Sequence, residues 1–398
     1  MKILVICQYY FPEPFRITDI CEELVRCGNE VTVVTGTPNY PTGDIYKGYE
    51  NGKRAEENIG GVRIIRCPIH PRKQGTLHRL WNYYSYPYRS KCAVRKLKDN
   101  FDVVFINQLS PVMMAEAGIW YAKKHNIKSV LYCLDLWPAS LAVGGINKGI
   151  MYNWFHRGSS RIYHSVDKIL VSSKSFSKYF EDEFGLSDTT YLPQYAEEAF
   201  TPDECMKTPD ENIDLMFAGN VGTAQSMDTV IRAAALCKDI QKLRWHIVGD
   251  GKELYACKKL AEEFGAPVVF HGRKPIEEMP KYYAMADAMI VTMQKDPIIS
   301  LTLPGKVQSY MAAGKPIIGA IDGEAKQIIS ESQCGVCADA EDAGGLAACV
   351  RAFILSDKKM FADNSIRYYD SHYKKPEFIS KLQSILSENI GSQGSAKL

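Results

Sequence analysis

The feature of this chain that most constrains its fold is an alternation of short apolar runs with helical segments, which occurs twice along the sequence. Each apolar run is only four or five residues long. Continuous apolar runs of this length are typical of strands buried on both faces of a parallel sheet. The strands predicted in the first half are 3–7, 31–35, 62–66, 103–106, 129–133 and 168–172, and those in the second half are 213–217, 245–248, 268–271, 288–292, 316–319 and 335–338.

A polar connection with two prolines separates the two series at 201–212. Two βαβ series in tandem predict an α/β fold of two doubly wound, Rossmann-like domains facing a central cleft, with ligands outside the carboxyl ends of the strands. A length of 398 residues agrees with two domains. We expect the domains at 1–198 and 199–374, then a helix at 375–390 that packs back on the first domain, and a disordered tail at 391–398. An aromatic-rich bend at 368–373 is expected to precede that helix.

The net charge of +2 conceals a difference between the two halves of the chain. Residues 1–195 carry 25 Lys and Arg against 18 Asp and Glu, whereas the remainder carries 23 against 28. A basic first half indicates an anionic partner, with membrane lipid and nucleic acid as the candidates.

The cysteines and the hydropathy pattern indicate a cytoplasmic enzyme without a membrane span. Only Cys334 and Cys337 form a Cys-x-x-Cys pair, and no second pair lies at zinc-ligand spacing. We therefore interpret this pair as part of a buried strand, with a redox or metal site as the alternative. Scattered cysteines fit a reducing compartment. Neither a secretory signal nor an uncharged apolar run of 18 residues is present, so no transmembrane helix is predicted.

The most informative loop follows the first strand of the second domain and reads Gly219-Asn220-Val221-Gly222. Its glycines let backbone N–H groups approach an anion, and the following helix N-terminus adds a favourable dipole. The alternative is a tight strand–helix turn that binds nothing. The Gly-x-Gly-x-x-Gly pattern of dinucleotide-binding enzymes does not follow the first strand of the chain.

Other residues of the second domain also suggest phosphate binding. Pro304, Gly305 and Lys306 open a helix, and a Lys in the first turn opposes the helix dipole unless an anion sits there. Arg273 follows another strand and can donate two parallel hydrogen bonds to a phosphate. We expect both cations at a solvated cleft, with an ordinary surface cation as the alternative for each. Gly249 and Gly251 permit a sharp turn beside the same cleft.

Polar and aromatic residues follow strands of the first domain as well. Asp135, just before Trp137, ends a predicted strand, where its carboxylate could orient or deprotonate an acceptor hydroxyl. A helix N-cap is the alternative role. The loops after the first two strands are expected to be ordered over the cleft, and they contain Glu13, Arg16, Asn39 and Tyr40.

The segment 70–98 holds eight Lys and Arg and no acidic residue, interleaved with Trp81 and several tyrosines. Such a mixture is typical of a surface that docks on anionic lipid headgroups. Single-stranded nucleic acid would use the same chemistry, and a half-buried basic helix is the third interpretation.

Five motifs in collinear order resemble those of glycosyltransferase family 4. They lie at 35–41, 135–138, 219–222, 248–251 and 310–316, and the resemblance extends over about residues 1–390. It is strongest to bacterial capsule and O-antigen enzymes that resemble N-acetyl-fucosamine transferases. The resemblance implies a GT-B fold, a nucleotide-sugar donor (usually a UDP-sugar), retention at the anomeric carbon and no metal or other cofactor. It also implies a polyprenyl-diphosphate-linked saccharide acceptor, a peripheral position at the inner face of the cell membrane, and no nucleic acid partner.

The chain departs from this family at the two glutamates that usually lie eight positions apart. The first normally contacts the donor sugar and the second the ribose, but here Leu301 and Ser309 occupy these positions. The family's Arg and Lys after the glycine-rich strand are missing too. We infer that Lys306 and Arg273 supply the positive charge, that Gln308 or Ser309 replaces the ribose contact, and that Glu324 reaches the donor. The competing interpretations are a donor-binding subunit without catalysis and a nucleotide-sugar epimerase of the same architecture.

Overall fold

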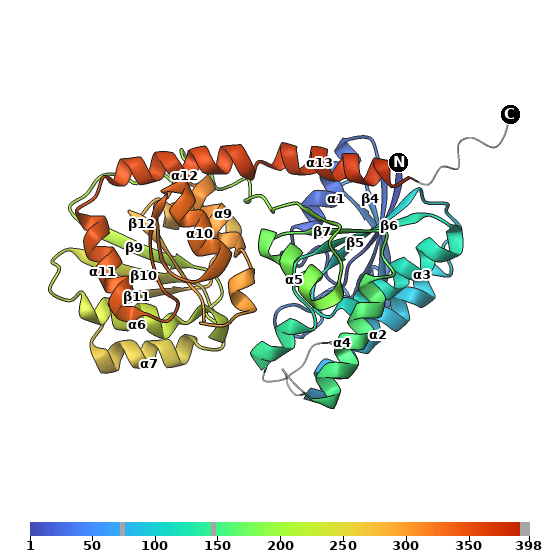
Figure 1. The fold of residues 1–398 in the computed structure, drawn as a ribbon, viewed down its shortest axis with the longest axis horizontal. Helices are drawn as coiled ribbons and strands as arrows, with labels where there is room; N and C mark the ends of the chain where they lie inside the picture. Colours follow the sequence, from blue (N-terminus) through green and yellow to red (C-terminus); the bar gives the residue numbers. More distant parts are fainter. Residues whose placement is uncertain (72–75, 145–148, 391–398) are drawn as a thin grey trace. The chain divides into compact units, whose positions relative to one another are not determined.

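The computed structural model describes residues 1–71, 76–144 and 149–390, with the backbone alone for 76–80 and 143–144. Internal contacts divide the chain into two compact units, drawn in Figure 1. Unit 1 comprises Met1–Leu192 and the C-terminal segment from Ile379, and unit 2 comprises Pro193–Phe378. The tail expected at 391–398 lies outside the described residues.

Unit 1 contains an eight-stranded sheet with the order β3-β4-β2-β1-β5-β6-β7-β8. Every pairing is parallel except the antiparallel pair β3–β4. The strands are β1 (Lys2–Ile6), β2 (Glu30–Gly36), β3 (Glu56–Ile59), β4 (Val62–Cys67), β5 (Val103–Gln108), β6 (Lys128–Cys133), β7 (Lys168–Val171) and β8 (Thr189–Tyr191). The helices are α1 (Ile17–Arg26), α2 (Thr76–Val94), α3 (Glu116–His125), α4 (Ile150–Tyr163) and α5 (Lys174–Phe184), joined by the end of α13 (Lys375–Glu388).

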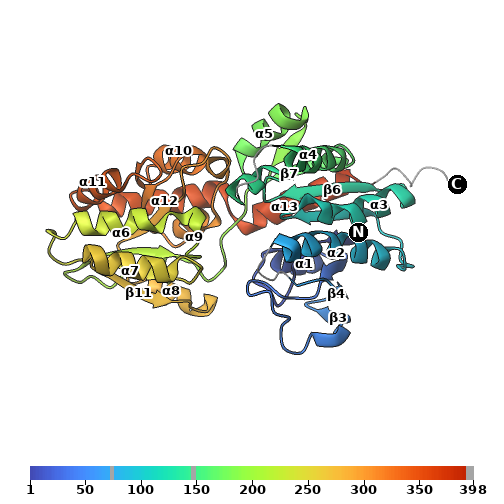
Figure 2. The same ribbon diagram turned by 90° about the horizontal axis from the view of Figure 1, so that it is seen from below.

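Unit 2 contains a six-stranded, fully parallel sheet with the order β11-β10-β9-β12-β13-β14. The strands are β9 (Ile213–Ala218), β10 (Leu243–Val248), β11 (Val268–Gly272), β12 (Ala288–Thr292), β13 (Ile317–Ala320) and β14 (Gly335–Ala338). The helices are α6 (Met227–Leu236), α7 (Leu254–Phe264), α8 (Met279–Tyr283), α9 (Gly305–Ala312), α10 (Gly323–Ser332), α11 (Ala343–Ile354) and α12 (Lys358–His372). Figure 2 shows helices on both faces of this sheet, as in a doubly wound fold.

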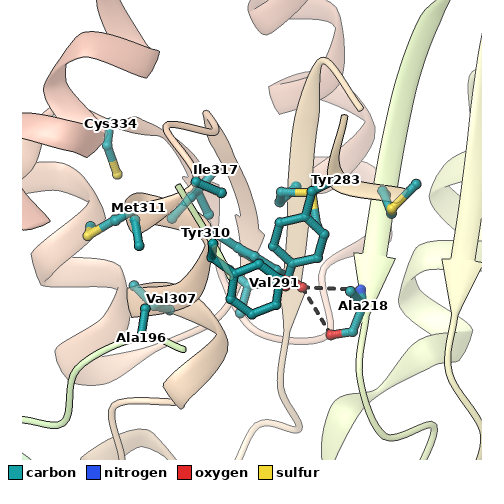
Figure 3. Packing of buried hydrophobic residues seen from close by; sticks show 14 of the residues in the cluster. Ala196, Ala218, Tyr283, Val291, Val307, Tyr310, Met311, Ile317 and Cys334 are labelled. Carbon is teal, nitrogen blue, oxygen red and sulfur yellow. Dashed lines mark hydrogen bonds between the residues drawn. The ribbon is translucent and has the colours of Figure 1, made fainter. Parts of the chain in front are cut away.

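The alternation of side chains along β9 places buried residues on both faces of the sheet in unit 2. Met216 and Ala218 pack with residues of α8, α9 and α10, whereas Leu215 and Phe217 pack with residues of α6, α7 and α11. On the first face, the Tyr310 hydroxyl of α9 accepts the Ala218 N–H (3.2 Å) and donates to the Ala218 carbonyl (3.1 Å), as Figure 3 shows. This pair of hydrogen bonds fixes α9 against the carboxyl end of β9.

The predicted fold class is confirmed: both units are Rossmann-like, and each of the twelve predicted strands corresponds to an observed one. Two short strands were missed. β3 reads Glu-Glu-Asn-Ile and β8 reads Thr-Thr-Tyr, and both lie at sheet edges, where polar residues are tolerated. Neither has the continuous apolar run by which the other strands were recognised.

Two local predictions in the last third of the chain were wrong. The segment expected as a bend at 368–373 continues helix α12 to His372, and the rings of Tyr368 and His372 stack with their centroids 4.1 Å apart, one turn apart on the helix. Cys337 lies in a strand, as expected, but β14 is a half-buried edge strand rather than a buried one.

The boundary between the units lies at Leu192/Pro193, earlier than the expected 198/199. Hydrogen bonds explain the difference, because the Ala196 N–H donates to the Tyr369 hydroxyl of α12 (3.1 Å) and the Glu197 carboxylate accepts from Ser309 of α9 (2.9 Å). The connecting segment is thus part of unit 2 from Pro193 onward.

Candidate functional site

The site in unit 2 is built at the carboxyl ends of β9 and β10, where two glycine-containing loops are packed directly against each other. A Cβ at Gly249 would lie 1.8 Å from the Gly219 carbonyl oxygen, and one at Gly251 would lie 2.3 Å from the Val221 carbonyl oxygen. The Val221 N–H also donates to the Asp250 carbonyl at 2.9 Å. Close approach of the two loops therefore requires glycine at 249 and 251.

The backbone N–H groups of the 219–222 loop are largely used within unit 2. Gly219 N–H donates to the Val248 carbonyl (2.9 Å), and Gly222 N–H donates to the Gln225 side-chain oxygen (3.2 Å). With the Val221 bond, three of the four N–H groups expected to face an anion already have partners. The glycines were expected to let the N–H groups of this loop approach an anion, but these three N–H groups are bonded within unit 2.

Lys306 brings the positive charge to this loop. Its Nζ is shielded from solvent and has no hydrogen-bond partner among the described residues. It lies 3.7 Å from the centroid of the Phe217 ring, and a Cβ at Gly219 would lie 3.3 Å from it. Burial lowers the pKa of this amine from 10.5 to about 7. The expectation of a solvated Lys306 was wrong, because the amine is directed inward, toward the end of β9.

The position of Lys306 corresponds to the switch point of the sheet, where chain order reverses between β9 and β12. These strands pair only at Leu215–Ala288 and Met216–Met289, whereas β9 pairs with β10 as far as Ala218. Ligands of open α/β sheets bind at such switch points. Here the Thr292 hydroxyl donates to the Gln225 carbonyl (2.6 Å) and the Gln294 N–H donates to the Ala224 carbonyl (2.8 Å), so the loop after β9 bridges to the end of β12.

The first turn of α9 is held by its own side chains and by a carboxylate. The Gln308 amide, oriented with its nitrogen toward the backbone, donates to the Pro304 carbonyl (3.0 Å) and to the Gly305 carbonyl (3.3 Å). The Ser309 hydroxyl is 2.9 Å from a carboxylate oxygen of Glu197 and 3.2 Å from the Gly305 carbonyl. Both residues proposed as ribose contacts therefore have internal partners, and the structure adds Glu197, which the sequence analysis did not single out.

Three other residues were predicted to bind the donor: Arg273, Glu324 and Asn220. They lie on other elements of unit 2 than Lys306. Arg273 is exposed after the edge strand β11, and β10 lies between β11 and β9. No hydrogen bond or ion pair joins it to another described residue. Glu324 is only 4% exposed in the first turn of α10, and Asn220 is exposed in the glycine loop. The structure thus does not bring Arg273 and Lys306 into contact.

In unit 1, Glu13 ties two loops together at the carboxyl ends of β1 and β2. Its carboxylate accepts the N–H groups of Asn39 (2.8 Å), Tyr40 (2.7 Å) and Tyr10 (3.2 Å), and its side chain is buried. Burial raises its pKa to about 7, even though these three N–H groups favour the charged form. Glu13 thus has a positioning role that the sequence did not reveal, and it orders the loop of Asn39 and Tyr40 as expected.

Aromatic rings also pack the loops after β1 and β2 together. The rings of Tyr9 and Phe15 stack at 5.0 Å, and Tyr40 packs against both. Arg16 directly follows Phe15, at the N-cap of α1, and is partly exposed. The loops after β1 and β2 are therefore one packed structure rather than two independent loops.

Asp135 lies after β6 and is bonded to a residue from the neighbouring strand. Its carboxylate accepts a hydrogen bond from Ser110, which follows β5, and the Ser110 and Ser140 hydroxyls are 3.0 Å apart. Trp137 is buried between Tyr83 and Phe155, with ring centroids 5.5 Å from each, so it is a core residue and does not present its ring to a ligand. Its indole Nε1 has no hydrogen-bond partner among the described residues.

Within the described ranges, no helix is both long enough and apolar enough to span a bilayer.

Comparison with known proteins identifies both units. Residues 15–193 match the model of the glycosyl transferase 4-like domain, and residues 205–367 match that of glycosyl transferases group 1. A putative colanic acid biosynthesis glycosyl transferase of Escherichia coli, WcaI, is 26% identical over 90% of this chain and 93% of its own length.

Two solved structures share the fold over nearly the whole chain. Sucrose-phosphate synthase from Thermosynechococcus elongatus superposes with a TM-score of 0.77 at 15% identity, covering 97% of this chain and 98% of that one. Anabaena HepE, in complex with UDP and glucose, gives a TM-score of 0.71 at 14% identity, covering 98% of this chain and 100% of that one. The fold is therefore GT-B, and with its two matched domains this chain is a glycosyltransferase.

Proposed function

We propose that this glycosyltransferase transfers a sugar from a nucleotide-sugar donor to a lipid-linked saccharide in the biosynthesis of a bacterial surface polysaccharide. The observation that carries the proposal is the amine of Lys306, shielded at the switch point of unit 2 without a hydrogen-bond partner among the described residues. A buried ammonium without an anionic partner is strongly destabilising, so such a group is retained where a ligand provides the anion. A donor diphosphate between the loop of Gly219 and the start of α9 would supply it.

The proposed chemistry is departure of the nucleoside diphosphate without a metal. No Asp-x-Asp sequence occurs in the chain, so the carboxylate pair that commonly holds a donor's metal is missing. A positive charge fixed at the leaving group stabilises the charge that develops there as the glycosidic bond breaks. Lys306 supplies this charge, and the guanidinium of Arg273 adds to it if the donor extends toward β11. Family resemblance supports retention at the anomeric carbon.

Glu197 supports the ribose part of the proposal. Its carboxylate is hydrogen-bonded to Ser309, the position at which related enzymes have a ribose-binding glutamate. We propose that Glu197 accepts hydrogen bonds from the ribose hydroxyls in place of that residue, and that Ser309 orients it. A uridine nucleotide is the donor class of choice, because HepE was solved with UDP.

Asp135 is proposed to orient the attacking hydroxyl of the acceptor, with Ser110 holding its carboxylate. The name of WcaI, for colanic acid biosynthesis, supports a saccharide acceptor. We propose a saccharide on a polyprenyl diphosphate carrier at the cytoplasmic face of the membrane, in capsule or O-antigen assembly. Among possible donor sugars, an N-acetyl-fucosamine type is the first to test.

The experiment is a screen of nucleotide sugars for thermal stabilisation, followed by turnover with the best binder. A donor at 100 times its Kd adds about 2.7 kcal/mol to stability. Adding a polyprenyl-linked acceptor should then release the nucleoside diphosphate, and NMR of the product should show the anomeric configuration of the donor. Binding without release would indicate a donor-binding subunit, and release of an epimerised sugar without acceptor would indicate an epimerase. Either result, or no stabilisation by any nucleotide sugar, would refute the proposed function.

A further inference from the structure

One surface of unit 1 exposes large apolar side chains from two different helices. On α2 these are Trp81 (66% exposed), Tyr84 (40%) and Tyr88 (67%), spaced so that they lie along one side of the helix. On the first two turns of α4 they are Ile150 (92%), Met151 (47%) and Trp154 (59%). We call these six residues the α2–α4 face.

The two halves of this face are continuous through Tyr84. The rings of Tyr84 and Trp154 have centroids 6.2 Å apart. Tyr84 also lines two hollows. One, of about 330 Å³, lies toward Trp154 and Arg157, and the other, of about 620 Å³, lies toward Trp81 and Tyr88. Single exposed apolar residues are normal, but a connected group of six rimmed by polar residues indicates an interaction surface.

The charge around the face is mainly positive. Neither the segment 70–98 nor the segment 137–166 contains an Asp or Glu, although the whole chain has 46 acidic residues. Arg89 and Arg157 line the two hollows and are not ion-paired with any described residue. The acidic residue at the rim, Glu116, lies 3.3 Å from Arg161, so its charge is compensated.

We propose that the α2–α4 face docks on an anionic lipid bilayer, with its aromatic and aliphatic side chains in the headgroup region and the arginines at the lipid phosphates. Trp and Tyr are the side chains that favour the membrane interface, and basic residues near them add attraction to anionic lipid. A second copy of this chain is the less favourable occupant, because a symmetric interface would bring the arginines of two copies together. A lipid-linked acceptor stays in the bilayer, so an enzyme that uses it has to dock on the membrane. In this respect the inference rests on the proposed function.

The structure changes which residues should be tested. From the sequence, the basic residues of 70–98 were the expected lipid contacts, among them Arg89, Lys91, Arg95 and Lys96. However, the Arg95 guanidinium lies over the ring of Trp120 on α3, 5.1 Å from its centroid. The apolar residues at the start of α4 were not singled out from the sequence, because they lie outside the basic and aromatic segment 70–98. Arg89 and Arg157, together with the apolar residues of α4, are therefore the informative positions.

The test is flotation of the full chain with vesicles of phosphatidylglycerol and phosphatidylcholine, or of phosphatidylcholine alone. We expect binding to the anionic vesicles that is released by high salt. The triple variant Ile150→Ser, Met151→Ser, Trp154→Ser should weaken it at least tenfold, and Arg89→Gln with Arg157→Gln should weaken it about fivefold for each charge removed. The matched control is Tyr255→Ser with Leu355→Ser, two residues of unit 2 that are 81% and 89% exposed, and it should bind as the unaltered chain does.

Tryptophan fluorescence provides a second measurement on the same face. Quenching by lipids brominated in the upper acyl chain should be strong and should be lost in the variant Trp81→Phe, Trp154→Phe, which keeps the apolar surface and should still bind. Unchanged binding of the triple serine variant, equal loss in the control, or a vesicle-independent dimer that the triple variant abolishes would each overturn the proposal. Stabilisation by nucleotide without vesicles reports on the donor site alone. Vesicle binding without nucleotide binding would therefore refute the proposed function but support the docking face. Nucleotide binding without vesicle binding would refute the docking face and leave the donor site of the proposed function supported.

Discussion

Replacing Lys306 by methionine should make the ligand-free protein more stable and the enzyme inactive. The amine is shielded from solvent and its pKa is lowered from 10.5 to about 7. A difference of this size corresponds to about 5 kcal/mol between the charged and neutral forms. Methionine has a similar length, has no charge and can pack on the ring of Phe217. We expect a gain of about 2 kcal/mol at pH 7, seen as an increase of several degrees in Tm.

The lowered pKa of Lys306 also predicts the direction in which stability changes with pH. A lysine whose pKa is lowered by folding binds fewer protons in the native state than in the unfolded state between pH 7 and 10.5. Stability should therefore rise with pH across this window, by up to about 1.4 kcal/mol per pH unit from this group, and the full cost should remain below pH 7. The methionine variant should lose this rise.

Donor binding should reverse the effect, because a diphosphate beside the amine favours its charged form. Calorimetry at pH 8 in buffers of different ionisation enthalpy should show proton uptake on nucleotide binding by the unaltered protein and none by the variant. Removing one charge from a leaving-group site should lower kcat by roughly 10² or more. A destabilised Lys306→Met variant that still binds nucleotide would refute this reasoning and make Lys306 a structural residue.

Lys315 is the matched control. It is also buried, and burial lowers its pKa to about 8, but its Nζ donates to the Ala286 carbonyl at 2.8 Å. Lys315→Met leaves that carbonyl without its partner, which costs about 1–3 kcal/mol. This loss offsets the relief of the buried charge at Lys315, so Lys315→Met should not raise Tm as Lys306→Met does, and only the substitution at Lys306 should lower kcat.

Other predictions test the remaining parts of the site. A chelator should leave turnover unchanged, and a strict requirement for Mn²⁺ or Mg²⁺ would contradict the proposed basic diphosphate site. Arg273→Ala should lower kcat by about 10² with the fold intact, since the side chain is exposed; full activity would mean that the donor does not extend to β11. Asp135→Asn should lower kcat by at least 10² without changing nucleotide affinity, whereas Ser110→Ala, which removes only the hydroxyl that holds the carboxylate, should have a smaller effect. Glu197→Gln should weaken binding of the nucleotide about tenfold, and the adjacent exposed Glu198→Gln should not; equal affinities would remove Glu197 from the ribose site.

The fold was predictable because its strongest signal is local. Each central strand is a short apolar run, and chain order together with the preference for right-handed crossovers fixes how such strands form parallel sheets. The edge strands β3 and β8 lack this signal, since an edge strand needs to be apolar on only part of its surface. The helix through Tyr368 and His372 was missed for a different reason: aromatic density was interpreted as a bend, whereas the rings stack along one helix face.

The site was predictable only in part, because sequence position fixes which strand end a residue follows but not where its side chain points. Lys306 was found from its place in the first turn of a helix, yet its amine is directed inward to Phe217 rather than to solvent. Gly249 and Gly251 were expected to form a sharp turn beside the cleft, but the sequence did not show that the carbonyls of the adjacent loop would be their closest neighbours. Asp135 was recognised, but Ser110, its partner from the neighbouring strand, has no signature in a single sequence.

The carboxylate at the start of α9 shows most clearly what sequence order conceals. In related enzymes it belongs to the helix itself, and its replacement by Ser309 suggested that Gln308 or Ser309 had taken over the ribose contact, or that catalysis was lost. In this protein, Glu197 is not part of a recognisable sequence motif. It lies 112 positions before Ser309, in a connecting segment with no regular structure. The Ala196 bond to Tyr369 and the Ser309 bond to Glu197 fix that segment to unit 2. A carboxylate can therefore occupy the same end of α9 from a different part of the chain, so loss of a motif residue does not by itself imply loss of the charge at the site.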